Sequence, residues 1–115
     1  KEAAEGYYFL RPPVPQDLPF EKTKAFLKAY IAKHGAAPGS IWAVLAGDGF
    51  LTVTEAIKAV KSTDPDKLAE FLHSGEQTIS GLTGEISFNE KGDRVGEVYR
   101  VYRVDAEGNF VLQPK

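Results

Sequence analysis

The feature that most constrains the fold is a proline-rich segment near the start of the chain, Arg11-Pro12-Pro13-Val14-Pro15. Proline fixes φ at about −65° and has no backbone N–H, so such a segment enters neither a helix interior nor the middle of a sheet. We therefore predict a stiff, extended connector that belongs to neither neighbouring helix and follows a short aromatic strand over residues 6–10. On the residues alone, the connector is either an ordinary loop or a hinge between two structural units.

Three helices are expected after the connector. Residues 21–34 carry apolar side chains at helical spacing, and Gly35 provides a stop signal. A second helix should begin near Ser40 as its N-cap and run to residue 60. Its first half is apolar on nearly all sides, which indicates burial on several faces. A short third helix is predicted over residues 66–74, because a proline suited to a first helical turn precedes it.

The last third of the chain has the apolar period of strands. We predict a strand over residues 85–88, a turn over residues 89–93 and a returning segment over residues 94–96, which together form a β-hairpin. Residues 97–104 are the longest strand candidate. Residues 110–112 form a last short strand after a turn. The pattern predicts a mixed α/β fold.

The tripeptide Gly47-Asp48-Gly49 is out of place inside the second predicted helix. A helical glycine costs about 0.8–1 kcal/mol relative to Ala, and sequence rules break most often at functional or closely packed sites. One hypothesis is therefore a functional site. The other is tight packing of the helix, with the Asp48 carboxylate satisfied by a neighbouring backbone amide.

The sequence contains no recognisable catalytic set. It has no Cys, its two His residues fall at predicted helix ends, and phosphate-binding glycine patterns are absent. We therefore expect neither an enzyme nor a metal or other cofactor. The formal net charge of −2 argues against a nucleic-acid partner. No stretch approaches the ~20 apolar residues that a membrane-spanning helix needs.

The chain contains no Met, so Lys1 is not expected to be a native translation start. Either a leader has been removed or the sequence is a piece of a longer protein, and no signal peptide distinguishes the two.

Several motifs occur in an order that is typical of one protein family. The most specific is the stretch 81–94, Gly-Leu-Thr-Gly-Glu-Ile-Ser-Phe-Asn-Glu-Lys-Gly-Asp-Arg. It is similar to a G-x-T-G-x-I-x-F-D-x-x-G-D-R string, with Asn89 in place of the customary Asp. Ala3-Ala4-Glu5-Gly6 and Ser62-Thr63-Asp64-Pro65 match two further motifs. Over nearly its whole length the chain resembles the C-terminal part of periplasmic branched-chain amino-acid-binding proteins, the extracytoplasmic receptors of ABC importers.

The resemblance implies the type I periplasmic-binding fold, in which two α/β lobes hold a ligand in the cleft between them. The expected fold class is therefore α/β: a fragment of the two-lobe fold with three helices, a β-hairpin and hinge-crossing strands. Arg11, Pro12 and Pro13 would then belong to a hinge. The implied organisation is a distal-lobe strand (1–10), a hinge connector (11–19), N-terminal-lobe helices and hairpin (20–95), and a second crossover strand with a distal-lobe tail (96–115).

The same resemblance implies where the ligand would bind. Members of the family often carry A-Y-D-A at the cleft wall, where this chain has Ala46-Gly47-Asp48-Gly49. Gly47 in place of Tyr removes a ring, so a bulkier or aromatic ligand would fill the space better. The candidate ligand-binding residues are Gly47 and Asp48 together with Trp42 and Val44, one turn earlier. For Trp42 and Val44, plain core packing is the alternative.

The implied function is the solute-binding component of an ABC importer, located in the periplasm or otherwise outside the cytoplasm. Its partners would be a small-molecule ligand, such as an amino acid or a related aromatic compound, and a membrane permease. The alternatives are a ligand-binding sensor domain of a signalling receptor and a small hydrolase that uses Asp48. Because the upstream strands of both lobes would be missing, we expect the chain alone to form an intertwined homodimer and not to bind the ligand of the intact protein.

Overall fold

The structure is a computed structural model that describes residues 2–96 and 99–114. The described residues form three α-helices, five β-strands and two short 3-10 helices. In chain order these are η1 (Glu2–Ala4), β1 (Tyr8–Arg11), η2 (Pro15–Asp17), α1 (Glu21–His34), α2 (Trp42–Val60), α3 (Pro65–His73), β2 (Ile79–Gly81), β3 (Gly84–Ile86), β4 (Arg100–Val104) and β5 (Phe110–Leu112).

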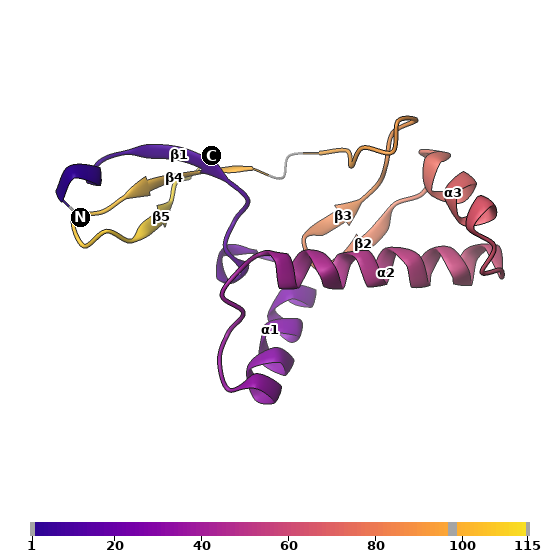
Figure 1. The fold of residues 1–115 in the computed structure, drawn as a ribbon, viewed down its shortest axis with the longest axis horizontal. Coiled ribbons are helices and arrows are strands. Elements are labelled where there is room, and N and C mark those ends of the chain that lie inside the picture. The colour runs from indigo at the N-terminus through magenta and orange to yellow at the C-terminus, as the bar shows by residue number, and fades with distance from the viewer. Residues whose placement is uncertain (1, 97–98, 115) are drawn as a thin grey trace.

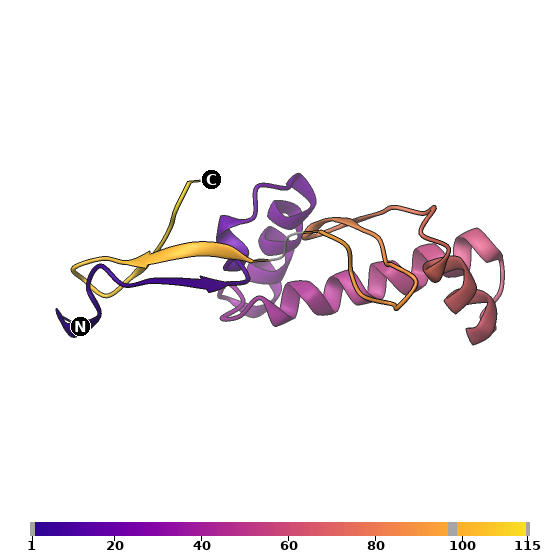
Figure 2. The same cartoon turned by 90° about the horizontal axis from the view of Figure 1, so that it is seen from above.

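The elements form two groups along the long axis of the molecule (Figure 1). At one end, β1, β4 and β5 make an antiparallel sheet with β4 in the centre. At the other end, the β2–β3 hairpin lies along α2, with α1 below it and α3 at the far end (Figure 1). Seen from above, the sheet is a thin ribbon that extends away from the helices (Figure 2). The strand predicted over residues 6–10 and the one predicted over residues 97–104 thus contribute β1 and β4, which pair with each other within this chain.

The molecule is more extended than a compact domain of this length. Its radius of gyration is 17.0 Å, against about 13 Å for a globular chain of this length. Its accessible surface is 7976 Å², against about 6,200 Å² for a folded monomer of this mass. The chain therefore exposes surface that a compact domain would bury.

The main core lies where the start of α2 meets the hairpin turn. Leu18, Ile41, Val44 and Leu82 are buried there, and Phe26 from α1 packs against them. A second apolar cluster lies on one face of the sheet. In it the Phe9 ring lies 6.0 Å from that of Tyr102 and 4.9 Å from that of Phe110. These two clusters hold the helical group and the sheet group, respectively.

The helices largely follow the sequence. Residues 21–34 form α1 with the predicted bounds, and Gly35 ends it in a left-handed conformation with φ of 79°. The N-cap of α2 is Ile41 instead of Ser40, whose Oγ accepts the Trp42 amide hydrogen just before the helix. The third helix begins one residue earlier than predicted, at Pro65, because the Asp64 carboxylate caps its first turn.

Three other expectations need correction. The connector is extended only as far as Val14, since Pro15 begins η2, whose first turn can accept a proline. The hairpin strands are β2 and β3 around a Leu82-Thr83 turn, whereas the predicted return at residues 94–96 makes only one bridge, Phe88 to Arg94. The second helix is not buried all round, because Trp42 and Phe50 are 72% and 71% exposed.

The predicted strand over residues 97–104 is described only in part. Strand β4 begins at Arg100, and the predicted positions 97 and 98 lie outside the described residues. No helix in the described part of the chain is both long and apolar enough to cross a membrane.

Candidate functional site

Asp48 is the centre of the contact between α2 and the hairpin. Its side chain is buried, with the residue 4% exposed, and its carboxylate accepts hydrogen bonds from the Leu82 amide, the Thr83 amide at 3.2 Å and the Thr83 hydroxyl. A two-residue turn leaves these two backbone donors without partners in the hairpin ladder. The carboxylate therefore acts as a cap that fixes the turn onto α2.

Arg94 completes this network from the other side of the turn. Its guanidinium donates to the Thr83 hydroxyl oxygen at 2.7 Å and to the Glu85 carbonyl at 3.2 Å. It also lies 3.7 Å from an Asp48 carboxylate oxygen, so the buried negative charge has a cation beside it. From α1, the Thr23 hydroxyl donates to the Leu82 carbonyl. Two helices and Arg94 thus hold one tight turn.

The two glycines that flank Asp48 have different environments. A Cβ added to Gly47 would lie 2.6 Å from the Leu82 Cδ1 atom and 3.7 Å from the Phe26 ring, whereas a Cβ at Gly49 would meet nothing within 4 Å. Only Gly47 is therefore required for close approach of α2 to the hairpin turn. This is the packing hypothesis from the sequence, with the Asp48 carboxylate bound to backbone amides.

These environments predict different effects on stability for the same Gly→Ala substitution at the two positions. Gly49→Ala should stabilise the chain by about 1 kcal/mol, because Ala has the higher helix propensity and finds open space. Gly47→Ala should lose this gain, because the buried Leu82 side chain must move. Urea denaturation of both variants would measure the difference. Equal stabilisation by both would show that Gly47 is not a packing residue.

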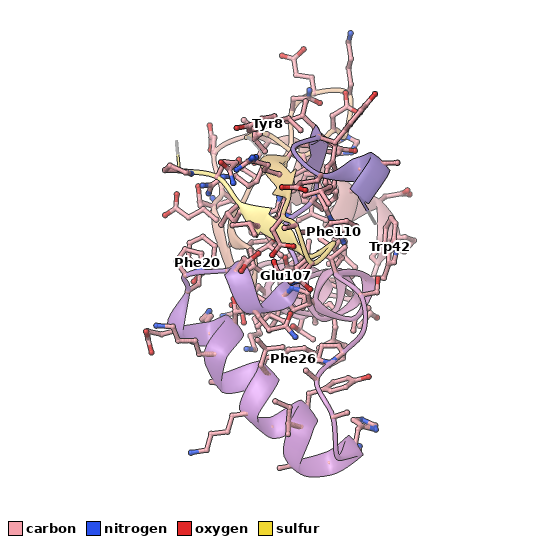
Figure 3. All side chains as sticks on the ribbon, turned by 90° about the vertical axis from the view of Figure 1, so that its left-hand side faces the viewer. Tyr8, Phe20, Phe26, Trp42, Glu107 and Phe110 are labelled. Carbon is pink, nitrogen blue, oxygen red and sulfur yellow. The ribbon has the colours of Figure 1, made fainter. Side chains whose placement is uncertain are left out.

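The structure separates the four sequence-predicted ligand-binding residues. Val44 has no exposed surface, Gly47 faces Leu82, and Asp48 binds the turn. These three therefore take part in the interior contact between α2 and the hairpin. Trp42 is apart from them on the outer side of α2, and its ring points away from the body of the molecule (Figure 3).

A pocket that the sequence did not predict lies beside this contact. We call it the connector pocket; its volume is about 180 Å³. It forms where the proline connector, the start of α2, the hairpin turn and β4 come together. Three of its residues are charged, namely Asp17, Arg94 and Arg100, and most of the others are apolar. The lining residues are Pro12, Pro13, Asp17, Leu18, Pro19, Phe20, Ile41, Leu45, Thr83, Arg94 and Arg100.

Tyr102 joins the two segments that run between the sheet and the helical group. It has no exposed surface, and its hydroxyl donates to the Asp17 carboxylate at 2.8 Å and accepts the Val14 amide hydrogen at 3.1 Å. Burial, followed by the hydrogen bond to Asp17, raises the pKa of Tyr102 above its usual value of 10.0. Strand β4 is thereby fastened to the connector that follows β1.

This pKa shift predicts a loss of stability at alkaline pH. Between the unfolded and folded pKa values of Tyr102, the native state keeps a proton that the unfolded state has lost, so stability falls as pH rises above about 10. Tyr102→Phe should lower stability by about 1–2 kcal/mol at pH 7, because it removes two hydrogen bonds. It should also remove part of the alkaline decline. Urea denaturation at pH 7 and at several values above 9 would check both. If the free energy of unfolding of Tyr102→Phe fell with alkaline pH as steeply as that of the unmodified chain, Tyr102 would not be the group responsible for the decline.

No group of three or more potential metal-ligating side chains occurs among residues 2–96 and 99–114.

Comparison with known proteins identifies the family. The sequence pattern of one family, described as periplasmic binding protein, matches residues 1–109. The chain belongs to the periplasmic binding protein family. The family resemblance and the α/β fold class inferred from the sequence are thereby confirmed. A search among curated proteins finds no significant match.

Solved structures of periplasmic binding proteins have the same arrangement. A leucine binding protein from Thermotoga maritima is 26% identical, with a TM-score of 0.76 over 98% of this chain. An ABC transporter substrate-binding protein from Desulfitobacterium hafniense, in complex with Leu, is 27% identical with a TM-score of 0.77 over 96%. A solute binding protein of an ABC transporter from Rhodopseudomonas palustris, in complex with 3,4-dihydroxy benzoic acid, is 25% identical with a TM-score of 0.71 over 96%. The chain spans 31%, 32% and 30% of these proteins, respectively.

Proposed function

We propose that the two-lobe protein to which this chain corresponds is the solute-binding component of an ABC importer. The observation that carries the proposal is the family match over residues 1–109, and the division of the described residues into a sheet group and a helical group (Figure 1) supports it. In this proposal the sheet belongs to the distal lobe and the helical group to the N-terminal lobe. The protein works outside the cytoplasm and delivers its solute to a membrane permease.

The proposed hinge is the stretch around Arg11, Pro12 and Pro13. Arg11 ends β1 opposite Arg100 of β4, and the two prolines follow without regular secondary structure. Lobe closure needs a few residues that absorb a change in backbone angles between rigid bodies. The residues between the paired strands and η2 occupy such a position.

Trp42 is the predicted ligand-binding residue that we retain in the proposal. Its side chain is at the start of α2 and is largely exposed in this chain. A large exposed aromatic side chain next to a proposed cleft is well suited to contact an apolar ligand. Asp48, in contrast, is buried and accepts three hydrogen bonds, which argues against the hydrolase that would use it.

The proposed ligand is an amino acid or a related small acid, with aromatic acids included. Two of the similar structures are complexes with Leu and with 3,4-dihydroxy benzoic acid. The test is a thermal-shift screen of amino acids and aromatic acids on the two-lobe protein. A ligand at 100 times its Kd should stabilise the folded state by about 2.7 kcal/mol. Turnover of a ligand, or no stabilisation by any compound, would overturn the proposal.

We further propose that the 115-residue chain alone self-associates through its exposed apolar faces. Tyr8, Leu10 and Val101 lie exposed on one sheet face, and Trp42 and Phe50 lie exposed on α2. The excess accessible surface of roughly 1,800 Å² exceeds the ~800 Å² per partner that a stable interface buries. A second copy is the only occupant available to a purified chain.

The expected result is a dimer or larger oligomer at low micromolar concentration, measured by light scattering. Phe50→Glu should weaken the association at least tenfold, because it would bury a charge in an apolar interface. Lys58→Glu, on an exposed part of the same helix, is the control. A stable monomer at these concentrations would contradict the proposal.

A further inference from the structure

The connector pocket has the features of a binding site for a small organic acid. Its walls include Pro12 and Pro13 of the connector, Arg100 at the start of β4, and residues of the helical group. Its volume of about 180 Å³ suits a molecule of a few heavy atoms. A ligand held there would contact the connector, the start of β4 and the helical group at once.

Arg94 lines this pocket with a positively charged side chain whose position is already fixed by hydrogen bonds. Its guanidinium is anchored by the Thr83 hydroxyl and by the Glu85 carbonyl, as described above. Such anchoring means that little side-chain entropy is lost when an anion binds. Thr83, which lines the same pocket, adds a polar group beside it.

Arg100 provides the second cation, and its environment favours an anion beside it. It lies directly opposite Arg11 in the register of β1 and β4, and like charges in that relation destabilise a sheet. Arg11 is engaged elsewhere, because its guanidinium lies 5.8 Å from the Tyr102 ring and 5.6 Å from the Phe110 ring. An anion in the pocket would place a negative charge beside the Arg100 side chain and so offset the unfavourable pairing of two like-charged residues in the sheet.

The other walls determine what kind of anion fits. Leu18, Ile41 and Leu45 make the pocket largely apolar, so a bare phosphate or sulfate would leave those walls in contact with water. The Asp17 carboxylate, held by the Tyr102 hydroxyl, adds one negative charge that disfavours a dianion. A monocarboxylate with a compact apolar body is complementary to this combination of groups.

We propose that the connector pocket binds the carboxylate of a small apolar organic acid between Arg94 and Arg100. The proposal rests on the proposed solute-binding function and deepens it by naming the chemical group that the hinge side of the protein recognises. The acid is either a plain carboxylic acid or an α-amino acid, whose ammonium group would face Asp17. Both have the same carboxylate chemistry, and the choice of probes distinguishes them.

The test is an NMR titration of the ¹⁵N-labelled 115-residue chain at low ionic strength, with isovalerate, isovaleramide and valine as probes. Isovalerate should shift the Thr83 and Leu45 amide signals in a saturable way. Isovaleramide, which has the same shape without the charge, should bind at least tenfold more weakly. If valine binds at least as well as isovalerate, the acid is an α-amino acid; if it binds more weakly, the acid is a plain carboxylate.

Two variants identify the site. Arg100→Gln should weaken isovalerate binding at least fivefold, and it should remain folded because it removes the repulsion with Arg11. Arg103→Gln is the matched control, since Arg103 lies on the opposite face of β4 with its guanidinium 6.0 Å from the Tyr8 ring. The proposal would be overturned if both variants weakened isovalerate binding equally, or if isovaleramide bound as tightly as isovalerate.

This outcome is separable from that of the thermal-shift screen. The titration tests a pocket formed by this chain alone, whereas the screen requires closure of two lobes around a solute. Binding in the titration would go against the expectation from the sequence that the chain alone does not bind the ligand of the intact protein. If isovalerate binds to the 115-residue chain but no compound stabilises the two-lobe protein in the screen, the importer function is rejected and the carboxylate site is supported. If a compound stabilises the two-lobe protein but isovalerate binding to the chain does not depend on Arg100, the importer function is supported and the carboxylate site is rejected.

Discussion

Replacing Asp48 with Ala is expected to lower the free energy of unfolding by about 3–5 kcal/mol, which is a large part of the stability of a domain of this size. The carboxylate satisfies two backbone amides and a hydroxyl in the Leu82-Thr83 turn. Removing it leaves the buried Leu82 amide and the partly buried Thr83 donors unpaired, and it leaves Arg94 without the acid beside it. Urea denaturation followed by circular dichroism would measure the change.

Two further variants show whether the position of the carboxylate matters. Glu55→Ala also removes an acid from α2, but this side chain only forms an exposed pair with Lys58, so little change is expected. Asp48→Asn keeps the shape but directs an amide donor toward other donors, and it should cost nearly as much as Asp48→Ala. If Asp48→Ala were as mild as Glu55→Ala, the carboxylate would not be what holds the turn.

The helices were predictable from the sequence because their signals are local. The bounds of α1 follow from a period of apolar residues and a glycine stop within one short stretch. The start of α3 follows from Asp64 and Pro65 in the same way. Each of these signals acts within one turn of the helix it ends or begins, so no distant residue is needed to interpret it.

The hairpin could not be placed correctly because a distant residue fixes its turn. Gly81-Leu82-Thr83-Gly84 looks like a strand interrupted by glycines, whereas it is the turn and its flanks. The group that stabilises this turn is the Asp48 carboxylate, 34 residues away from Leu82. The sequence did show that residues 47–49 were exceptional, but it could not name the partner.

The candidate site was predictable only in part for the same reason. The apolar pattern of α2 does not tell which of its faces the rest of the chain covers, so exposed Trp42 and buried Val44 looked alike. The connector pocket combines residues from the connector, α2, the hairpin turn and β4, which are far apart in sequence. Arg94 lies within the most specific family motif, whereas nothing local distinguishes Arg100.

A second large effect is expected at Gly81, on the other side of the Asp48 carboxylate. A Cβ at this position would lie 2.6 Å from an Asp48 carboxylate oxygen and would also press on the Ile86 side chain. The carboxylate cannot move away without releasing the donors of the turn. Gly81→Ala should therefore lower the free energy of unfolding by about 2–4 kcal/mol, through overpacking and the loss of those hydrogen bonds.

Gly39→Ala is the matched control for this effect. A Cβ at Gly39 would meet nothing within 4 Å, and neither Gly39 nor Gly81 has a positive φ. Both substitutions restrict the unfolded chain equally, which by itself stabilises by about 0.4–1 kcal/mol. The difference between the two variants in urea denaturation therefore measures the close approach of the hairpin to α2. If both variants were stabilised alike, the hairpin would have to lie farther from Asp48, and the network that holds the turn would not exist as described.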